Sequence, residues 1–278
     1  MSAGPDQAWS HVAQRYSEYW SPRLRPYIER LVEVFEPAPE GPIAIPGCGP
    51  GDEVLLAEKR WADRSIIATD PAQGMISILW KRLREAGSTR AVASVGPAGH
   101  LSAFVRQAAG VLSSFTLQLL PNPIAALADW SRCLRAEGKV AALFWPHPPP
   151  ETVHGRLHAA LEASTGEKRL EWEAPTREEL PHLGFHLLSE ETVAFEIEHS
   201  SPEEFFDELV HSGPLHALEQ RLGKPVLERC RAQWITNTGF EAKGGGVVHR
   251  PPARIWILAR GEGQQGHAAG PIQEGLPK

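Results

Sequence analysis

Residues 43–51 read Ile-Ala-Ile-Pro-Gly-Cys-Gly-Pro-Gly, an apolar run that leads into a loop with a glycine at every second position. A helical stretch follows, and a second apolar run at 65–69 ends at Asp70. This order of strand, glycine loop, helix, strand and acid is typical of a βαβ unit that binds a nucleotide. Glycines let a loop turn tightly and approach a ligand closely, and Asp70 can accept hydrogen bonds from both hydroxyls of a ribose.

Strand-like and helical patterns alternate along the chain on both sides of this unit. The strand candidates of the first half lie at 43–45, 65–69, 90–95, 110–114 and 139–144. Helical patterns separate them at 52–61, 74–84, 101–108 and 123–135. Such alternation predicts an α/β fold with a mostly parallel sheet that is covered by helices on both faces.

A proline-rich run at 145–150 interrupts the alternation and divides the chain. Beyond it we expect inserted helices that form a lid, at 152–164, 177–183, 202–210, 215–222 and 224–236. Two further strands of the same sheet are expected at 187–198 and 253–259. The predicted organisation is an N-terminal helical segment (1–42) in two pieces broken at Ser21-Pro22, a ligand-binding core (43–145), the lid with the last two strands (146–260) and a disordered tail (261–278).

Composition disfavours several classes of function. The 278-residue chain has a net charge of −6 and no basic block, which argues against nucleic acid as a partner. Its apolar runs are too short to span a bilayer, and its N-terminus does not resemble a signal peptide. Three scattered cysteines are typical of free thiols in a reducing compartment. We therefore expect a cytoplasmic protein, monomeric or homodimeric, without a membrane or nucleic-acid partner.

The histidines give little indication of a metal site. The pairs His154 with His158 and His182 with His186 have the i,i+4 spacing of helical ligands. Neither pair is accompanied by cysteine or by a glutamate in an HExxH arrangement. We expect no metal.

The spacing of the glycine loop distinguishes between three ligands. A dinucleotide fingerprint counted from Gly47 requires glycine or alanine where this chain has Asp52, whose charge would also repel a pyrophosphate. A P-loop requires a Gly-Lys pair followed by serine or threonine, which is absent. S-adenosylmethionine carries no phosphate, so an acid beside the loop would not repel a phosphate group of this ligand. The spacing therefore favours S-adenosylmethionine.

The chain from Ile43 to Ala259 resembles the class I S-adenosylmethionine-dependent methyltransferases, in the small-molecule branch typified by ubiquinone and natural-product methyltransferases. The matching motifs are the loop Gly47–Gly51, the run Asp70-Pro71-Ala72-Gln73-Gly74-Met75, the segment 111–118 and the run 129–139. The resemblance implies a Rossmann-like sheet of seven strands with an antiparallel last strand. It also implies transfer of a methyl group to O, N or C of a small molecule bound above the carboxyl ends of the strands, with S-adenosylhomocysteine as the product of the cofactor.

The same resemblance implies the cofactor-binding residues. Asp70 would hold the ribose, Met75 would pack on the adenine, and Ser113 would approach the methionyl amine. Tyr16 and Trp20 would close over the cofactor from the N-terminal helix. The complete set consists of Tyr16, Trp20, Gly47, Cys48, Gly49, Gly51, Asp70, Pro71, Met75, Ser94, Val95 and Ser113.

This chain departs from the family pattern at positions that are usually acidic. Ile45 ends the first strand, Ser94 ends the third, and Ala108-Ala109 begin the fourth. Loss of a charge-assisted hydrogen bond costs roughly 1.5–3 kcal/mol. The missing acids therefore leave open a non-catalytic protein that keeps the fold as a partner or scaffold. A nucleotide-dependent oxidoreductase is a further alternative, which Asp52 disfavours.

Methyl transfer is an in-line displacement, so the protein mainly aligns the acceptor and removes a proton where one must leave. His147 directly follows the fifth strand and is the first candidate for the base; His154, His11 and Glu151 are further candidates. Phe115, Gln118 and Trp145 are expected to line the acceptor site. An aromatic lining predicts a flat or apolar metabolite as the acceptor.

Overall fold

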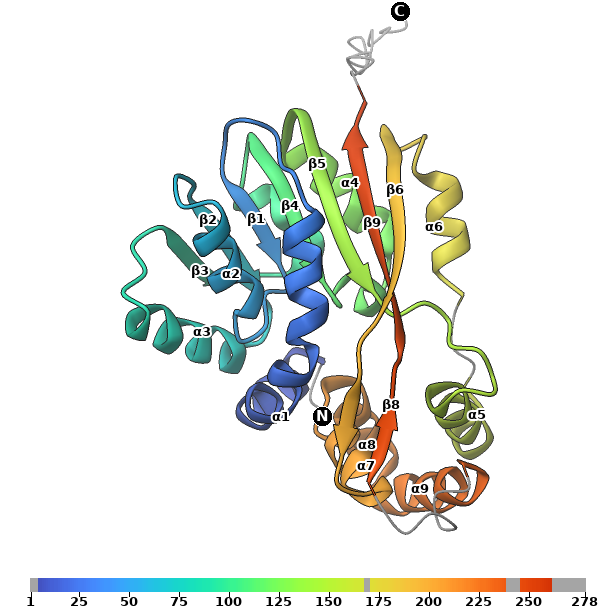
Figure 1. Ribbon diagram of the computed structural model, residues 1–278. Helices are drawn as coiled ribbons and strands as arrows, with labels where there is room; N and C mark the ends of the chain where they lie inside the picture. The colour runs from blue at the N-terminus through green and yellow to red at the C-terminus, as the bar shows by residue number, and fades with distance from the viewer. Residues whose placement is uncertain (1–4, 168–170, 239–245, 262–278) are drawn as a thin grey trace, which may run out of the picture.

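The computed structural model describes residues 5–167, 171–238 and 246–261, and a seven-stranded sheet lies at its centre (Figure 1). The strand order is β3-β2-β1-β4-β5-β9-β6, in which β9 runs antiparallel to both of its neighbours and the other pairs are parallel. This confirms the predicted Rossmann-like fold with an antiparallel last strand. The strands are β1 (Ile43–Pro46), β2 (Ile66–Asp70), β3 (Ala91–Val95), β4 (Ala108–Ser114), β5 (Leu134–Phe144), β6 (Phe185–Ala194) and β9 (Pro252–Arg260).

The central strands are apolar without alternation because both faces of the sheet are covered. Every residue of β1 and of β4 is buried. Ile43 and Ile45 belong to one core cluster, whereas Ala44, between them, belongs to a second cluster with Trp130. This division follows from the period of two along a strand. Helices α1 (Pro5–Val34), α2 (Asp52–Arg60) and α3 (Gln73–Glu85) lie on the first side, and η1 (Ala98–Ala103), α4 (Pro123–Cys133) and α6 (Glu173–Glu179) lie on the second.

The remaining elements form a lid at the carboxyl ends of the parallel strands. Figure 1 shows a short two-stranded sheet and several helices gathered beyond that end of the main sheet. Outside the lid, the short 3₁₀ helix η2 (Leu117–Leu119) follows β4. The lid contains α5 (Val153–Thr165), β7 (Ile197–His199), α7 (Pro202–Val210), α8 (Gly213–Leu222), α9 (Lys224–Thr238) and β8 (Val247–His249).

Several predicted boundaries are wrong. Helix α1 continues through Ser21-Pro22, where two separate pieces were expected, and it changes direction along its length (Figure 1). The two prolines inside it, Pro22 and Pro26, each remove a backbone donor and so allow a bend. The expected helix at 101–108 is the short 3₁₀ helix η1, and the expected strand at 187–198 is split between β6 and β7.

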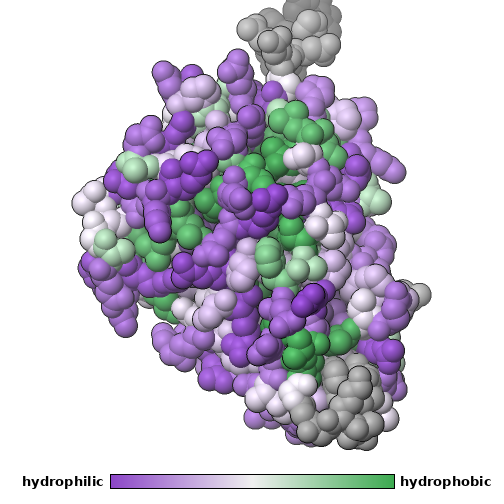
Figure 2. Space-filling view, viewed as in Figure 1, coloured by the Kyte–Doolittle hydropathy of each residue, from purple (hydrophilic) through white to green (hydrophobic). Residues whose placement is uncertain are grey.

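Hydrophilic residues cover most of the face shown in Figure 2, and hydrophobic residues appear between them in several places, over the sheet and near the lid. Within the described part of the chain, no helix is both long and apolar enough to cross a membrane. The predicted disordered tail at 261–278 lies, except for Gly261, outside the described residues.

Candidate functional site

A cavity of about 1960 Å³ lies between the carboxyl ends of the strands and the lid. Its floor includes Gly47, Gly49 and Asp70, which follow β1 and end β2. Its walls come from α1 on one side and from α5 and α8 of the lid on the other. A cavity of this size has room for a cofactor and an acceptor molecule together.

The three glycines of the loop have different roles. All have positive φ: +65° at Gly47, +50° at Gly49 and +93° at Gly51. A Cβ on Gly47 would lie 2.4 Å from Cγ2 of Thr116, and a Cβ on Gly51 would lie 2.2 Å from Cδ1 of Leu79. A Cβ on Gly49 would meet no protein atom within 4 Å. Gly47 and Gly51 therefore permit close packing, whereas Gly49 leaves open space on the cavity side.

Asp70 is held in a fixed orientation at the end of β2. Its Oδ2 accepts a hydrogen bond from Gly49 N–H at 2.9 Å, and its Oδ1 accepts one from Ala72 N–H at 2.8 Å. Burial raises its pKa to about 6, while these two hydrogen bonds oppose the shift. Each carboxylate oxygen retains a second lone pair, so the group can still accept two hydrogen bonds from a ligand.

Most of the predicted cofactor-binding residues border this cavity. The cavity-lining members of the predicted set are Tyr16, Trp20, Gly47, Gly49, Asp70, Pro71 and Met75. Cys48 borders a small adjoining pocket, and burial raises the pKa of its thiol well above the ordinary value. A thiol with a raised pKa is a poor nucleophile, so burial does not favour a nucleophilic role for Cys48.

Four predicted residues lie elsewhere. Gly51 faces Leu79. Neither Ser94 nor Val95 lines the cavity, where the following segment 97–99 lies instead. Ser113 is fully buried, and its hydroxyl has no hydrogen-bond partner among the described residues, while its neighbour Ser114 lines the cavity. Successive side chains of a strand point to opposite faces, so an offset of one residue moves a side chain out of the site.

Part of the cavity has an aromatic wall. Phe115 and Trp145 stack with ring centroids 4.5 Å apart and both line the cavity. Phe115 has φ of +54°, a conformation that costs energy for a residue with a bulky side chain and is found mostly at functional positions. Gln118 fixes the wall because its Oε1 accepts a hydrogen bond from Trp145 N–H at 2.5 Å.

The candidate bases differ in position. His147 lines the cavity, and its Nδ1 lies 3.2 Å from Oε1 of Glu171. Its side chain is half exposed. His154 lies deeper, with its ring centroid 6.4 Å from that of Trp145, and Glu151 also borders the cavity. His11 stacks on His216 outside the cavity lining.

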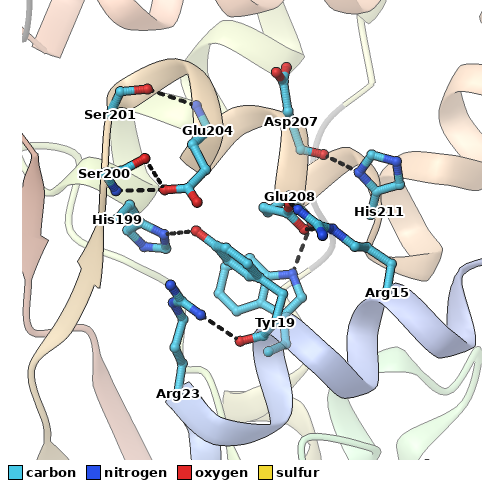
Figure 3. A network of polar contacts seen from close by, with 11 residues as sticks. Arg15, Tyr19, Arg23, His199, Ser200, Ser201, Glu204, Asp207, Glu208 and His211 are labelled. Carbon is cyan, nitrogen blue, oxygen red and sulfur yellow. Dashed lines mark hydrogen bonds and ion pairs between the residues drawn. The ribbon is translucent and has the colours of Figure 1, made fainter.

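A polar network fixes the lid against α1 (Figure 3). The hydroxyl of Tyr19 and Nδ1 of His199 are 2.6 Å apart, and Arg15 forms an ion pair with the buried Glu208. The indole N–H of Trp20 donates to the backbone oxygen of Glu208 at 2.9 Å. Burial lowers the pKa of His199 to about 4, so its ring is neutral at physiological pH. These contacts hold Tyr16 and Trp20 of α1 over the cavity.

Several polar residues that border the cavity or its small adjoining pocket were not singled out from the sequence, among them Glu53, Ser114 and His249. The position of Glu53, two residues after the glycine loop, was a signal, since the nearby Val54 and Ala57 are apolar and mark a buried face of α2. No local pattern distinguished His249, because its position depends on β8, a strand that was not predicted.

Comparison with known proteins agrees with this geometry. Residues 43–138 match the family described as a methyltransferase domain. A trans-aconitate 2-methyltransferase of Sinorhizobium medicae is 29% identical over 63% of this chain and 64% of its own length. The match thus spans less than two-thirds of the relative's length.

Two solved structures are similar in fold. The YcgJ protein of Bacillus subtilis has a TM-score of 0.59 at 12% identity, over 85% of this chain and 98% of its own. Geranyl diphosphate C-methyltransferase of Streptomyces coelicolor has a TM-score of 0.53 at 11% identity, over 84% of this chain and 75% of its own. Taken with the sheet order, the glycine loop and Asp70, the family match and the relative support a class I S-adenosylmethionine-dependent methyltransferase, with residues 43–138 as its methyltransferase domain.

Proposed function

We propose that this protein transfers a methyl group from S-adenosylmethionine to O, N or C of a small acceptor with an aromatic or apolar surface. One observation carries the proposal: a single cavity joins Gly49 and Asp70 to the stacked pair Phe115 and Trp145. A cofactor and an acceptor bound in one cavity can meet in the geometry that in-line displacement requires.

The residues at the loop fit the proposed cofactor. Gly49 leaves space beside the loop, Asp70 has acceptor capacity for a ribose diol, and the buried Met75 offers an apolar surface for adenine. When bound, S-adenosylmethionine supplies an activated methyl group and its own leaving group. The protein then needs to hold both molecules, exclude water and accept a proton where the acceptor loses one. His147 remains the proposed proton acceptor, at the rim of the cavity.

The charges around the cavity favour an aromatic or apolar acceptor over a polycarboxylate such as trans-aconitate. The arginines of the described cavity lining are each engaged by an acid: Arg132 by Asp129, Arg221 by Glu167 and Arg250 by Glu196. A guanidinium that is already paired offers less to an incoming carboxylate.

Two measurements test the proposal. Calorimetric titration with S-adenosylhomocysteine is expected to show binding, and no heat at millimolar ligand would contradict the assignment of the cofactor. A screen with methyl-labelled S-adenosylmethionine compares hydroxylated aromatic compounds with aliphatic polycarboxylates that include trans-aconitate. Labelling of the aromatic set supports the proposed acceptor class, whereas labelling of the polycarboxylates alone contradicts it. Methyl transfer to any acceptor also excludes the non-catalytic alternative.

A further inference from the structure

Glu53 is a buried carboxyl group without a cationic partner among the described residues. It occupies the first turn of α2 and is 4% exposed. Its Oε1 accepts a hydrogen bond from Ser114 Oγ at 2.7 Å. The charged groups that act on it are Asp52 and Asp70, which are both acids, and Asp52 is itself paired with Arg82 at 2.7 Å. A buried charge is costly unless a partner of opposite sign is supplied, so this arrangement leaves a place for a cation.

The carboxyl of Glu53 lies beside the glycine loop. Glu53 borders a small pocket together with Gly47, Gly49, Ser114 and Tyr16, and these four residues also line the main cavity. A ligand that rests on the loop from the main cavity would therefore reach the surroundings of Glu53.

Two carboxyl groups bracket the loop from opposite sides. Asp70 ends β2, the neighbour of β1 on one side, and Ser114, which donates to Glu53, ends β4 on the other side. A ligand whose ribose binds to Asp70 extends its opposite end toward Glu53. In S-adenosylmethionine that end carries an α-ammonium group with three N–H donors, whereas the sulfonium has no donor.

We infer that the Glu53 carboxylate binds the α-ammonium group of S-adenosylmethionine at the β4 side of the glycine loop. The inference rests on the proposed function and assigns to this chain a cofactor-binding residue outside the glycine-loop motif. Ser114 positions the carboxylate through its hydroxyl, and the ammonium group donates to the remaining lone pairs.

The protonation of Glu53 adds an observable consequence. Burial raises its pKa to about 8, the hydrogen bond from Ser114 opposes this shift, and Asp52 and Asp70 add to it. Tyr16 and Cys48 also face it, and its charge raises the pKa of both. At pH 7 the ligand-free group is therefore mostly neutral. When the ammonium binds, Glu53 ionises, the proton passes to solvent and the ion pair forms.

A pair of variants and a pair of ligands test the inference by calorimetry. S-adenosylhomocysteine carries the ammonium group, and 5′-methylthioadenosine lacks the amino-acid end but keeps the nucleoside. The test variant is Glu53→Gln. The matched control is Glu58→Gln, since Glu58 is also a buried acid of α2 and also accepts a hydrogen bond from a serine, Ser88 Oγ at 2.6 Å, away from the cavity lining.

We expect Glu53→Gln to raise the dissociation constant for S-adenosylhomocysteine at least tenfold and to change that for 5′-methylthioadenosine less than twofold. Glu58→Gln should change neither. Titrations of the unmodified protein at pH 7 in buffers of different ionisation enthalpy should show proton release with S-adenosylhomocysteine and little with 5′-methylthioadenosine. This measurement does not depend on the folding of a variant.

Three results would overturn the inference. The first is unchanged binding of S-adenosylhomocysteine by Glu53→Gln, and the second is equal weakening of both ligands. The third is equal proton release with both ligands. Each of these contradicts the role of Glu53 alone, in a protein that still binds the cofactor product. A protein that binds neither ligand would contradict the proposed function and the inference with it.

Discussion

The backbone N–H of Gly49 donates a 2.9 Å hydrogen bond to Oδ2 of Asp70 and so joins the loop after β1 to the end of β2. Two residues that line the cavity, Gly49 and Asp70, are therefore held together by this bond. A change in either residue affects both the shape of the loop and the acceptor groups that a nucleoside would meet.

Asp70→Ala is expected to raise the dissociation constant for S-adenosylhomocysteine at least tenfold. Two charge-assisted hydrogen bonds to the ribose would be lost, each worth roughly 1.5–3 kcal/mol, while tenfold corresponds to about 1.4 kcal/mol. Calorimetric titration measures the change. Asp63→Ala is the control, because this acid is 84% exposed and lies away from the cavity. An unchanged value for Asp70→Ala would mean that the ribose is held elsewhere.

Nucleoside binding should weaken as the pH falls through about 6. The folded-state pKa of Asp70 is raised to about 6, so the carboxylate that accepts the ribose hydrogen bonds is lost below that pH. Titration with 5′-methylthioadenosine from pH 8 to pH 5 measures the effect without the amino-acid end. Well below the transition, the dissociation constant should rise by about tenfold for each pH unit. If Asp70→Ala shows the same pH dependence, another group is responsible.

Glu53→Gln should make the ligand-free protein more stable at pH 8 than the unmodified protein. The folded-state pKa of Glu53 is about 8, against an ordinary value of 4.5, so between these values the folded state holds a proton that the unfolded state has lost. Stability therefore falls as the pH rises through this window, and glutamine abolishes that loss. Thermal unfolding should show a difference on the order of 1 kcal/mol or more at pH 8 and little at pH 4.5. A difference independent of pH would contradict the shifted pKa.

Alanine at two glycines of the loop should separate binding from stability. Gly49→Ala places a methyl group in open space on the cavity side and should weaken S-adenosylhomocysteine binding. Gly51→Ala forces a methyl group to within 2.2 Å of Leu79 and should mainly lower stability, by roughly 1–3 kcal/mol from overpacking. Calorimetry and denaturant unfolding on both variants measure the two effects. Equal losses of stability would show that Gly49 is as confined as Gly51.

Tyr19→Phe should lower stability by about 1–3 kcal/mol, because it removes the partner of the buried Nδ1 of His199 and keeps the aromatic ring. Denaturant unfolding measures the change. Glu18→Ala is the control on the same helix, since its hydrogen bond with Gln14 is exposed and its loss should stay within about 0.5 kcal/mol. A loss below this value for Tyr19→Phe would mean that the contact between the lid and α1 contributes little.

The sequence predicted the sheet, the glycine loop and Asp70 because these features are local. The apolar run 43–45, the loop after it and the acid at position 70 lie within one βαβ unit, whose spacing constrains their arrangement. Ser94, Val95 and Ser113 were predicted to contact the cofactor, but none of them lines the cavity. Ser114 lines it instead of Ser113, since a shift of one residue reverses the face of a strand, and the segment 97–99 beyond the end of β3 lines it in place of Ser94 and Val95.

Ile45 is a position where the sequence pattern alone did not indicate which acid lies beside the glycine loop. The family resemblance implies an acid at that position, and the chain has an apolar residue there. The structure instead brings a different acid, Glu53 on α2, to the side of the same loop. Whether Glu53 faces the small pocket beside the loop or the solvent depends on how α2 rotates against the sheet, and Val54 and Ala57 are buried on the same helix.

The sequence by itself determined the order of strands and helices, the turn of the glycine loop and the place of Asp70, because hydrophobic periodicity and glycine conformation act over a few residues. Only the tertiary structure decided which side chains meet. Glu53 reaches Ser114 across 61 positions and Tyr19 reaches His199 across 180. Contacts of this kind form only when whole helices and strands pack together, and the same packing forms the cavity and its lid.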